Sequence, residues 1–173
     1  AFNSNLYNKG KKALFFLLGT AGIVSFYAVL EKFGIDANYW VQDVQNRVFS
    51  TLGQPNWLGA YIDALIFIPL ALLFKSKPRS KKLLFAVLYF ILFLALLFTN
   101  SKSAILAFWL VFLFFSTAFI ILQKKLWKLI SLIFVLSLMI YLIMGGQTYR
   151  YLNKASSWIK LFLPQKQAVV KVE

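Results

Sequence analysis

Residues 47–62, RVFSTLGQPNWLGAYI, contain the side chains of this chain best suited to binding an anion. The segment begins with a cation, Arg47, passes through the turn residues GQPN and continues into an apolar run. Because Gly53 and Pro55 interrupt regular structure, a helix is predicted to begin just after Pro55. Its first turn would present backbone N–H groups and the positive end of the helix dipole, both of which favour an anion.

A second polar interruption, TNSKS at residues 99–103, lies between two other long apolar runs. The loop charges described below place both interruptions on the same side of a membrane. We therefore hypothesise that they line one anion-binding site near the boundary between lipid and water. The alternative interpretation is that they are two ordinary loops, each with an unrelated cation.

The two cations of these interruptions are the candidate catalytic residues, Arg47 and Lys102. Arginine can hold a phosphate through two parallel hydrogen bonds and keeps its charge at any physiological pH. Lys102 is the only cation between the third and fourth apolar runs, among polar neighbours. The alternatives are that Arg47 is an interfacial anchor reaching the lipid headgroups and that Lys102 is there by chance.

Four further residues are candidate substrate-binding positions. Gln54 and Asn56 could hydrogen-bond a sugar or phosphate, although turn formation alone would explain them. Asp63 lies inside an apolar run, where a charge is costly unless it meets a partner or water. It could form an ion pair with Arg47 or Lys102, or accept a proton. Ser101, beside Lys102, completes the set.

Composition predicts that these residues belong to an all-α integral membrane protein. The 173 residues are 61% hydrophobic and 18% aromatic, with a mean hydropathy of +0.74, and several runs approach the roughly 20 residues that span a bilayer. We expect a helical bundle of about five transmembrane spans, with short amphipathic helices at the membrane interface. The spans are expected at residues 13–30, 57–74, 83–98, 104–122 and 129–144.

The connections between spans supply the rest of the organisation. Val41, Val44 and Val48 recur at helical spacing beside aromatic residues, which predicts a short amphipathic helix in the interface. Residues 1–146 are assigned to the transmembrane region. Residues 147–173 are assigned to the start of an outer loop, with a second amphipathic helix. The first residue is not Met, and we expect this chain to be a segment of a longer one.

Loop charge predicts the orientation. Cations gather before the first span, in KSKPRSKK at 75–82 and in QKKLWK at 123–128, and they alternate with loops poor in cations. The positive-inside rule places the cation-rich set, and the N-terminus of this chain, in the cytoplasm. The net charge of +14 is thereby explained by topology, and we expect no nucleic-acid partner.

Several classes of chemistry are excluded or disfavoured by composition. The chain has no Cys and no His, which removes thiol catalysis and the commonest general base. Its carboxylates show no spacing typical of metal ligands, so neither a protein-bound metal nor another cofactor is expected. Cations at an outward-facing mouth suit an anionic lipid such as a polyprenyl diphosphate. They would stabilise the negative charge that develops on the departing diphosphate, and Asp63 or Asp43 would be the only carboxylates for a base.

The segment from residue 47 onward resembles the family of O-antigen ligases and polymerases. In that family an Arg precedes a run similar to GTFGNPNFLAGYL that enters a membrane helix. A later Thr-x-Ser-Arg break between two helices is matched here by TNSKSA at residues 99–104, with Lys102 at the family's Arg position. The matching residues of the first motif are Arg47, Gly53, Pro55, Asn56, Leu58, Ala60 and Tyr61.

The resemblance implies a multi-spanning glycosyltransferase of the bacterial inner membrane that works without a metal. Such proteins transfer a glycan from an undecaprenyl-diphosphate carrier to another glycan or to a lipid acceptor on the extracytoplasmic face. The family's Arg in the second motif is thought to hold the diphosphate, so the resemblance assigns that role to Lys102. The family also has a later outer loop with an Arg and a catalytic His, and this chain contains no His.

Two other classes of function stay open from the sequence. A transporter or flippase would move a lipid-linked or anionic solute along a path lined by Asp63 and the cations, although the internal repeats typical of transporters are not evident. A non-catalytic membrane scaffold would need no polar motifs at the mouths of its helices.

Overall fold

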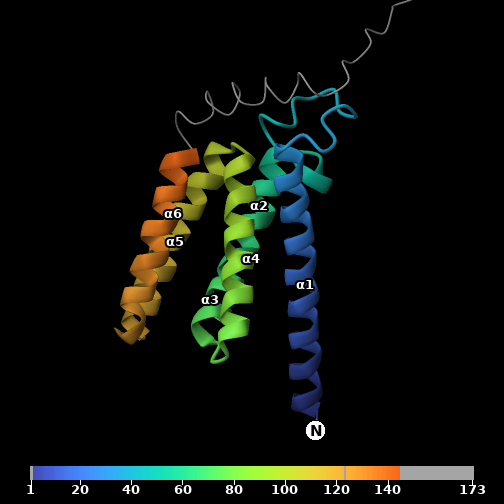
Figure 1. The fold of residues 1–173 in the computed structure, drawn as a ribbon. Coiled ribbons are helices and arrows are strands. Elements are labelled where there is room, and N and C mark those ends of the chain that lie inside the picture. The colour runs from blue at the N-terminus through green and yellow to red at the C-terminus, as the bar shows by residue number, and fades with distance from the viewer. Residues whose placement is uncertain (1, 123, 145–173) are drawn as a thin grey trace, which may run out of the picture. The chain divides into compact units, whose positions relative to one another are not determined.

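The computed structural model describes residues 2–122 and 124–144, and this part of the chain is helical, without a strand (Figure 1). The predicted all-α class is therefore confirmed. In chain order the elements are α1 (Phe2–Lys32), η1 (Ser50–Leu52), α2 (Pro55–Leu65), α3 (Phe67–Lys75), α4 (Arg79–Phe98), α5 (Lys102–Leu122), η2 (Lys124–Leu126) and α6 (Trp127–Met144).

Five helical stretches are long and apolar enough to cross a membrane, and each contains one of the predicted spans. The helices extend beyond the apolar runs because flanking polar residues join them. For example, Arg79–Phe98 includes the basic residues that precede the apolar run of α4. The chain is a multi-pass membrane protein. The stretches are Tyr7–Lys32, Pro55–Lys75, Arg79–Phe98, Lys102–Leu122 and Trp127–Met144.

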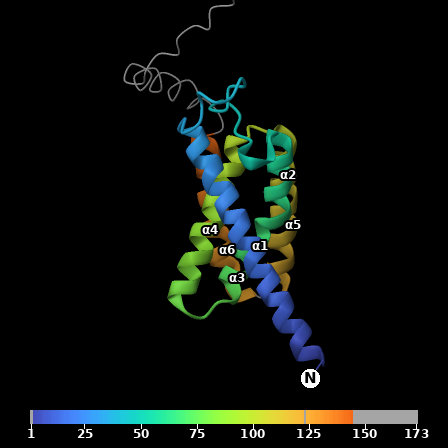
Figure 2. The ribbon, with the colours of Figure 1, turned by 90° about the vertical axis from the view of Figure 1, so that its right-hand side faces the viewer.

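The chain divides into two compact units, residues 1–130 and 131–173. In the first unit, α1 packs along α4, α3 packs along α4, and α2 packs against α4 and α5 (Figures 1 and 2). Aromatic rings join α3, α4 and α5, because Phe108 of α5 lies 5.7 Å from Phe67 and 5.0 Å from Phe93, measured between ring centroids. Phe93 and Phe108 are fully buried, so this cluster forms the core between these three helices.

The second predicted span, residues 57–74, is not one continuous helix but contains a break. α2 ends at Leu65 and α3 begins at Phe67, with Ile66 between them. Pro69 lies three residues farther on and has no backbone N–H, so the carbonyl group one turn earlier loses its helical donor. A proline is a common cause of such an interruption, and this one divides the span into two shorter helices.

The predicted amphipathic helix over Val41, Val44 and Val48 is wrong. Residues 33–47 form turns and bends, and the short η1 at 50–52 is the first helical element after α1. The three valines do not share a face, because Val44 and Val48 are buried whereas Val41 is fully exposed. Polar contacts with α1 bend this connection instead, and one of them runs from Lys32 Nζ to the carbonyl oxygen of Gln45 at 2.6 Å.

The turn between α4 and α5 is much shorter. Thr99 is the C-terminal cap of α4, and Asn100 has a φ of 51°. Asparagine tolerates this left-handed conformation, which often ends a helix. The chain therefore reverses within residues 99–101, and α5 begins at Lys102. The predicted outer loop and amphipathic helix over residues 147–173 lie outside the described residues.

Gly59 of α2 provides a test of the packing between α2 and α5. A Cβ atom at Gly59 would lie only 2.6 Å from the Cβ of Ala104. We therefore expect Gly59→Ala to lower the stability of the detergent-purified protein by about 1–3 kcal/mol, the usual cost of overpacking, measured as a lower Tm. Gly19→Ala is the matched control, because nothing lies within 4 Å of its Cβ position. Equal melting temperatures for the two variants would contradict this packing.

Candidate anion-binding site

Arg47 connects the two polar interruptions of the sequence. Its terminal Nη2 donates to Oδ1 of Asn56 at 3.1 Å, and its Nε donates to the carbonyl oxygen of Thr99 at 3.4 Å. Asn56 lies in the first turn of α2, and Thr99 caps the C-terminus of α4. The guanidinium group therefore joins residues that are far apart in the sequence, as the hypothesis of a single site requires.

The backbone and the packing around Arg47 bring the same segments together. The N–H of Val48 donates to the carbonyl oxygen of Phe98 at 3.1 Å. Gly59, one turn into α2, faces the α4–α5 turn, since a Cβ atom there would lie 3.7 Å from Ser101 Cβ and 3.7 Å from Thr99 Oγ1. The close approach needs a glycine. Figure 1 shows the start of α2 and the α4–α5 turn at the same end of the first unit.

Side chains of the α4–α5 turn hold its backbone in place. Thr99 Oγ1 donates to the carbonyl oxygen of Leu96 at 2.7 Å and accepts from the N–H of Ser101 at 3.2 Å. Ser101 Oγ accepts from the N–H of Ala104 at 3.5 Å and lies 3.2 Å from Ser103 Oγ. Ser101, predicted to bind substrate, is buried, and its hydroxyl group caps α5.

Four of the other predicted residues are exposed at this end. Arg47, Gln54, Asn56 and Lys102 all present accessible side chains. Gln54 is the N-cap position of α2, Pro55 is its first residue, and no side chain caps this helix. The first-turn N–H groups of α2 therefore lie beside an exposed guanidinium group, a combination that favours an anion. Lys102 adds a second cation at the start of α5.

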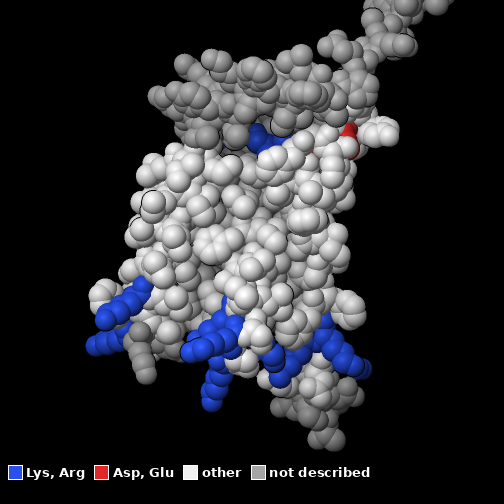
Figure 3. Space-filling model, viewed as in Figure 1, with Lys and Arg blue, Asp and Glu red and all other residues white. Residues whose placement is uncertain are grey.

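Figure 3 shows several groups of Lys and Arg side chains at the lower end of this face. One smaller group lies near the upper end. The end of α3, the α3–α4 connection and the first turn of α4 contribute Lys75, Lys77, Arg79, Lys81 and Lys82. α4 separates this connection from the α4–α5 turn by its 20 residues, or about 30 Å at 1.5 Å per residue. Arg47 and Lys102 therefore lie far from the cation-rich connection between α3 and α4.

Asp63 does not form the predicted ion pair with Arg47 or Lys102. Its Oδ1 is buried and has no hydrogen-bond partner. The reason is its depth in the helix, because Asp63 follows Asn56 by seven residues, which is about 10 Å along the helix axis. Arg47 instead meets the first turn. Asp63 is thus a half-buried carboxylate inside the span, just before the break at Ile66.

Glu31, a fully buried residue in the last turn of α1, is not among the predicted site residues. Its Oε2 accepts from the N–H groups of Phe49 and Ser50 at 2.9 and 2.8 Å. The signal available in the sequence was its position, because a negative charge in the last turn of a helix opposes the helix dipole. Such a residue needs donors from another part of the chain, and here they come from the segment that carries Arg47.

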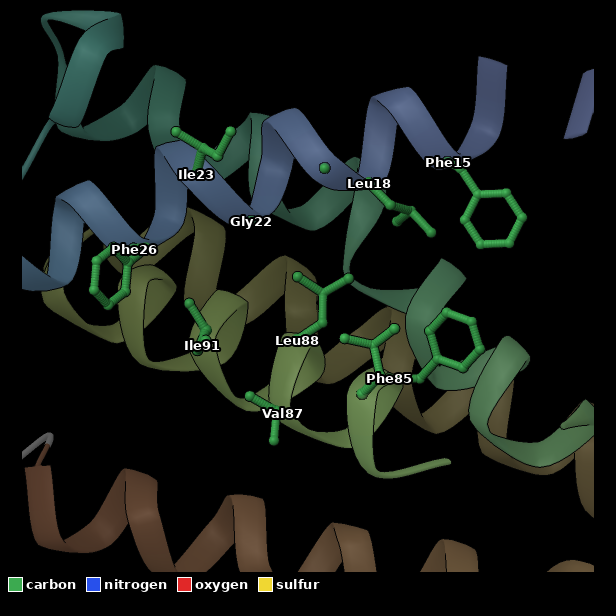
Figure 4. Close-up of a pocket in the computed structure, with 11 residues that line it drawn as sticks. Phe15, Leu18, Gly22, Ile23, Phe26, Phe85, Val87, Leu88 and Ile91 are labelled. Carbon is green, nitrogen blue, oxygen red and sulfur yellow. The ribbon is translucent and has the colours of Figure 1, made fainter. Parts of the chain in front are cut away.

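An apolar hollow of about 460 Å³ lies between α1 and α4 (Figure 4). Every residue that lines it is hydrophobic or glycine, including Phe15 and Phe26 of α1 and Phe85, Leu88 and Ile91 of α4. None of the predicted site residues lines it. Among the described residues there is also no group of three or more His, Cys, Asp or Glu side chains that could hold a metal ion.

Comparisons with known proteins find no matching family model, no similar curated protein and no similar solved structure.

The common side of the two interruptions can be tested by labelling single cysteines in the membrane. The chain has no native Cys, so Gln54→Cys and Lys102→Cys each introduce one reactive position. We expect a membrane-impermeant maleimide to label both from the same side of sealed vesicles, because both residues lie at the end where Arg47 joins α2 to the α4–α5 turn. Lys77→Cys, in the α3–α4 connection, should be labelled only from the other side. Labelling of residues 54 and 102 from opposite sides would exclude a shared site.

Proposed function

We propose that this chain is part of a membrane glycosyltransferase of the O-antigen ligase and polymerase type. It would transfer a glycan from an undecaprenyl-diphosphate carrier to a glycan or lipid acceptor on the extracytoplasmic face of the bacterial inner membrane. The observation that supports the proposal is the position of Arg47, whose guanidinium group reaches both motifs on which the resemblance rests, at Asn56 and at Thr99.

The diphosphate is held by electrostatic contacts at the N-terminal end of α2. A guanidinium group has five N–H donors, and the two contacts of Arg47 leave donors for phosphate oxygens. Lys102 and the first-turn N–H groups of α2 supply further positive potential. Because the substrate is a lipid, its chain stays in the bilayer while its anionic headgroup meets these cations at the boundary.

Transfer breaks the bond between the anomeric carbon and the diphosphate oxygen. An acceptor hydroxyl group forms the new glycosidic bond, and the electron pair of the broken bond leaves with the diphosphate. Fixed cations stabilise that developing charge, and this kind of stabilisation is often the largest catalytic contribution. The proton of the acceptor hydroxyl passes to a base. Asp43, an exposed residue whose carbonyl oxygen accepts from the N–H of Arg47 at 3.3 Å, is the carboxylate nearest to Arg47 along the chain.

Orientation follows from the distribution of loop charge. The cation-rich connection between α3 and α4 is assigned to the cytoplasm under the positive-inside rule. The α4–α5 turn, at the far end of α4, is then extracytoplasmic, and so is Arg47. This is the side on which a lipid-linked glycan would be transferred.

A transporter is the second candidate, and the observation that favours it is the broken span next to Asp63. Discontinuous helices near the middle of the membrane form ion and substrate sites in many transporters. In this alternative, the purified protein moves a fluorescent lipid diphosphate across the bilayer of sealed vesicles, and Asp63→Asn stops the movement. Under the proposed transferase function, the wild-type protein moves none.

The transferase proposal predicts the effect of removing either cation in the full-length protein. Arg47→Ala and Lys102→Ala should each reduce glycan transfer by about 100-fold or more, because each removes a group that stabilises the departing diphosphate. Lys102→Arg should retain activity, since it keeps the charge and adds the planar fork that suits phosphate. Gel analysis of glycan length in cells measures the effect.

Expression must be unchanged for this comparison, and Lys81→Ala is the matched control because it removes one cation at the other end of α4. Unaltered glycan length in both Arg47→Ala and Lys102→Ala would reject the proposed function. A loss in Lys81→Ala as large as in the other two would show that the effect comes from total charge.

A further inference from the structure

We infer that Glu31 is a positioning residue for Arg47, holding the backbone from which the guanidinium group reaches the proposed diphosphate site. The inference rests on the proposed function, because that function gives Arg47 its ligand. Glu31 itself is too deeply buried to meet a substrate, with 0% of its surface exposed. Its effect must therefore pass through the groups that it contacts.

Glu31 fastens the segment after Arg47 to the end of α1. One carboxylate oxygen, Oε2, accepts two backbone N–H groups, from Phe49 at 2.9 Å and from Ser50 at 2.8 Å. Both donors belong to buried residues, where an unpaired N–H group would be costly. Ser50 Oγ adds a third contact, since it donates to the carbonyl oxygen of Val24 at 2.8 Å.

The backbone conformation at this point suits a bound anion. Phe49 has φ −132° and ψ −11°, and Ser50 has a φ of 53°. In this conformation the successive N–H groups of Phe49 and Ser50 converge on one oxygen atom, Glu31 Oε2, as they do in the small anion-binding concavities formed by turns. A serine in the left-handed region is strained unless its surroundings hold it there. The carboxylate of Glu31 occupies the concavity and stabilises this conformation.

The fastened segment lies directly beside Arg47 in the chain. Val48, between Arg47 and Phe49, donates its N–H to the carbonyl oxygen of Phe98 at 3.1 Å. Residues 48–50 are thus hydrogen-bonded to α4 on one side and to α1 on the other. Arg47 projects from this fixed stretch to Asn56 and Thr99. A shift of the segment would move the guanidinium group away from α2 and from the end of α4.

A carboxylate is an unexpected choice if this position only fills space. Its second oxygen, Oε1, is buried without a hydrogen-bond partner, which carries a cost that an apolar side chain would avoid. What the carboxylate supplies is a pair of charge-assisted bonds to backbone N–H groups, which are stronger than neutral ones. These bonds fix the local geometry, and precise placement matters most where a charged group must meet its ligand.

The first measurement is hydrogen–deuterium exchange of the peptide that covers residues 47–50 in the purified full-length protein. Glu31→Leu removes the acceptor, so we expect faster exchange in this peptide than in the wild type. Glu31→Asp, one methylene shorter, should act in the same direction and serves if Glu31→Leu does not fold. Glu31→Gln keeps one oxygen at the position of Oε2 but loses the charge, so its exchange rate should lie between those of the wild type and Glu31→Leu. Unchanged exchange in both Glu31→Leu and Glu31→Asp would overturn the inference.

The second measurement is the affinity for farnesyl diphosphate, a short polyprenyl diphosphate, determined on the folded fraction of each variant. Misplacement of a binding group by about 1 Å can cost up to about 100-fold, so we expect Glu31→Leu to raise the Kd by about 10- to 100-fold. Arg47→Lys should also raise the Kd, and the double variant should be no weaker than the weaker single variant. Residues that act through one contact are not additive.

The two readouts separate the failure of this inference from the failure of the proposed function. A merely structural role for Glu31 would lower the yield of folded protein but leave the Kd of the folded fraction unchanged, and that result would overturn the inference. A double variant whose Kd rises by the product of the two single-variant increases would also overturn the inference. Absence of farnesyl diphosphate binding in the wild type would count against the proposed function instead, while the exchange rates would still decide whether Glu31 holds the Arg47 segment.

Discussion

The contact of one guanidinium group with two distant parts of the chain determines how the candidate site is built. Arg47 reaches Asn56 at the start of α2 and the carbonyl oxygen of Thr99 at the end of α4. These ends belong to two apolar helices, and a helix end leaves backbone groups without a partner inside the helix. Arg47, placed at the boundary, donates to the carbonyl oxygen of Thr99 and to the Asn56 side chain. It still leaves N–H donors for a ligand, and so does the first turn of α2.

The rest of the first unit supports this contact at increasing distance. Gly59 allows α2 to approach the α4–α5 turn closely, and Thr99 and Ser101 hold that turn through their own hydroxyl groups. Glu31 and Val48 fasten the backbone beside Arg47 to α1 and α4. Deep in the unit, aromatic rings of α3, α4 and α5 keep the helices together. A small polar cluster thus lies at one end of helices that are held together by apolar packing.

Local sequence patterns were enough to predict the membrane-spanning helices and the position of the polar cluster. The five spans follow from the length of apolar runs, and the helix start at Pro55 follows from its turn residues. Contacts between distant residues were not predictable in this way. Val41, Val44 and Val48 have helical spacing, but Glu31 and Lys32 draw their segment toward α1 instead. The break at Ile66 could have been predicted from Pro69. The lack of an ion pair between Asp63 and Arg47 could not, because it depends on how far along α2 each side chain lies.

The central claim is that the two polar interruptions lie together at one end of the helices and form one site. Chemical cross-linking in the native membrane tests it most directly, with a short bismaleimide and the double variant Gln54→Cys/Lys102→Cys. The account predicts efficient intramolecular cross-linking of this pair and none for Gln54→Cys/Lys77→Cys, whose second residue lies at the far end of α4. Failure of the first pair to cross-link, with both thiols shown to be reactive, would contradict the account.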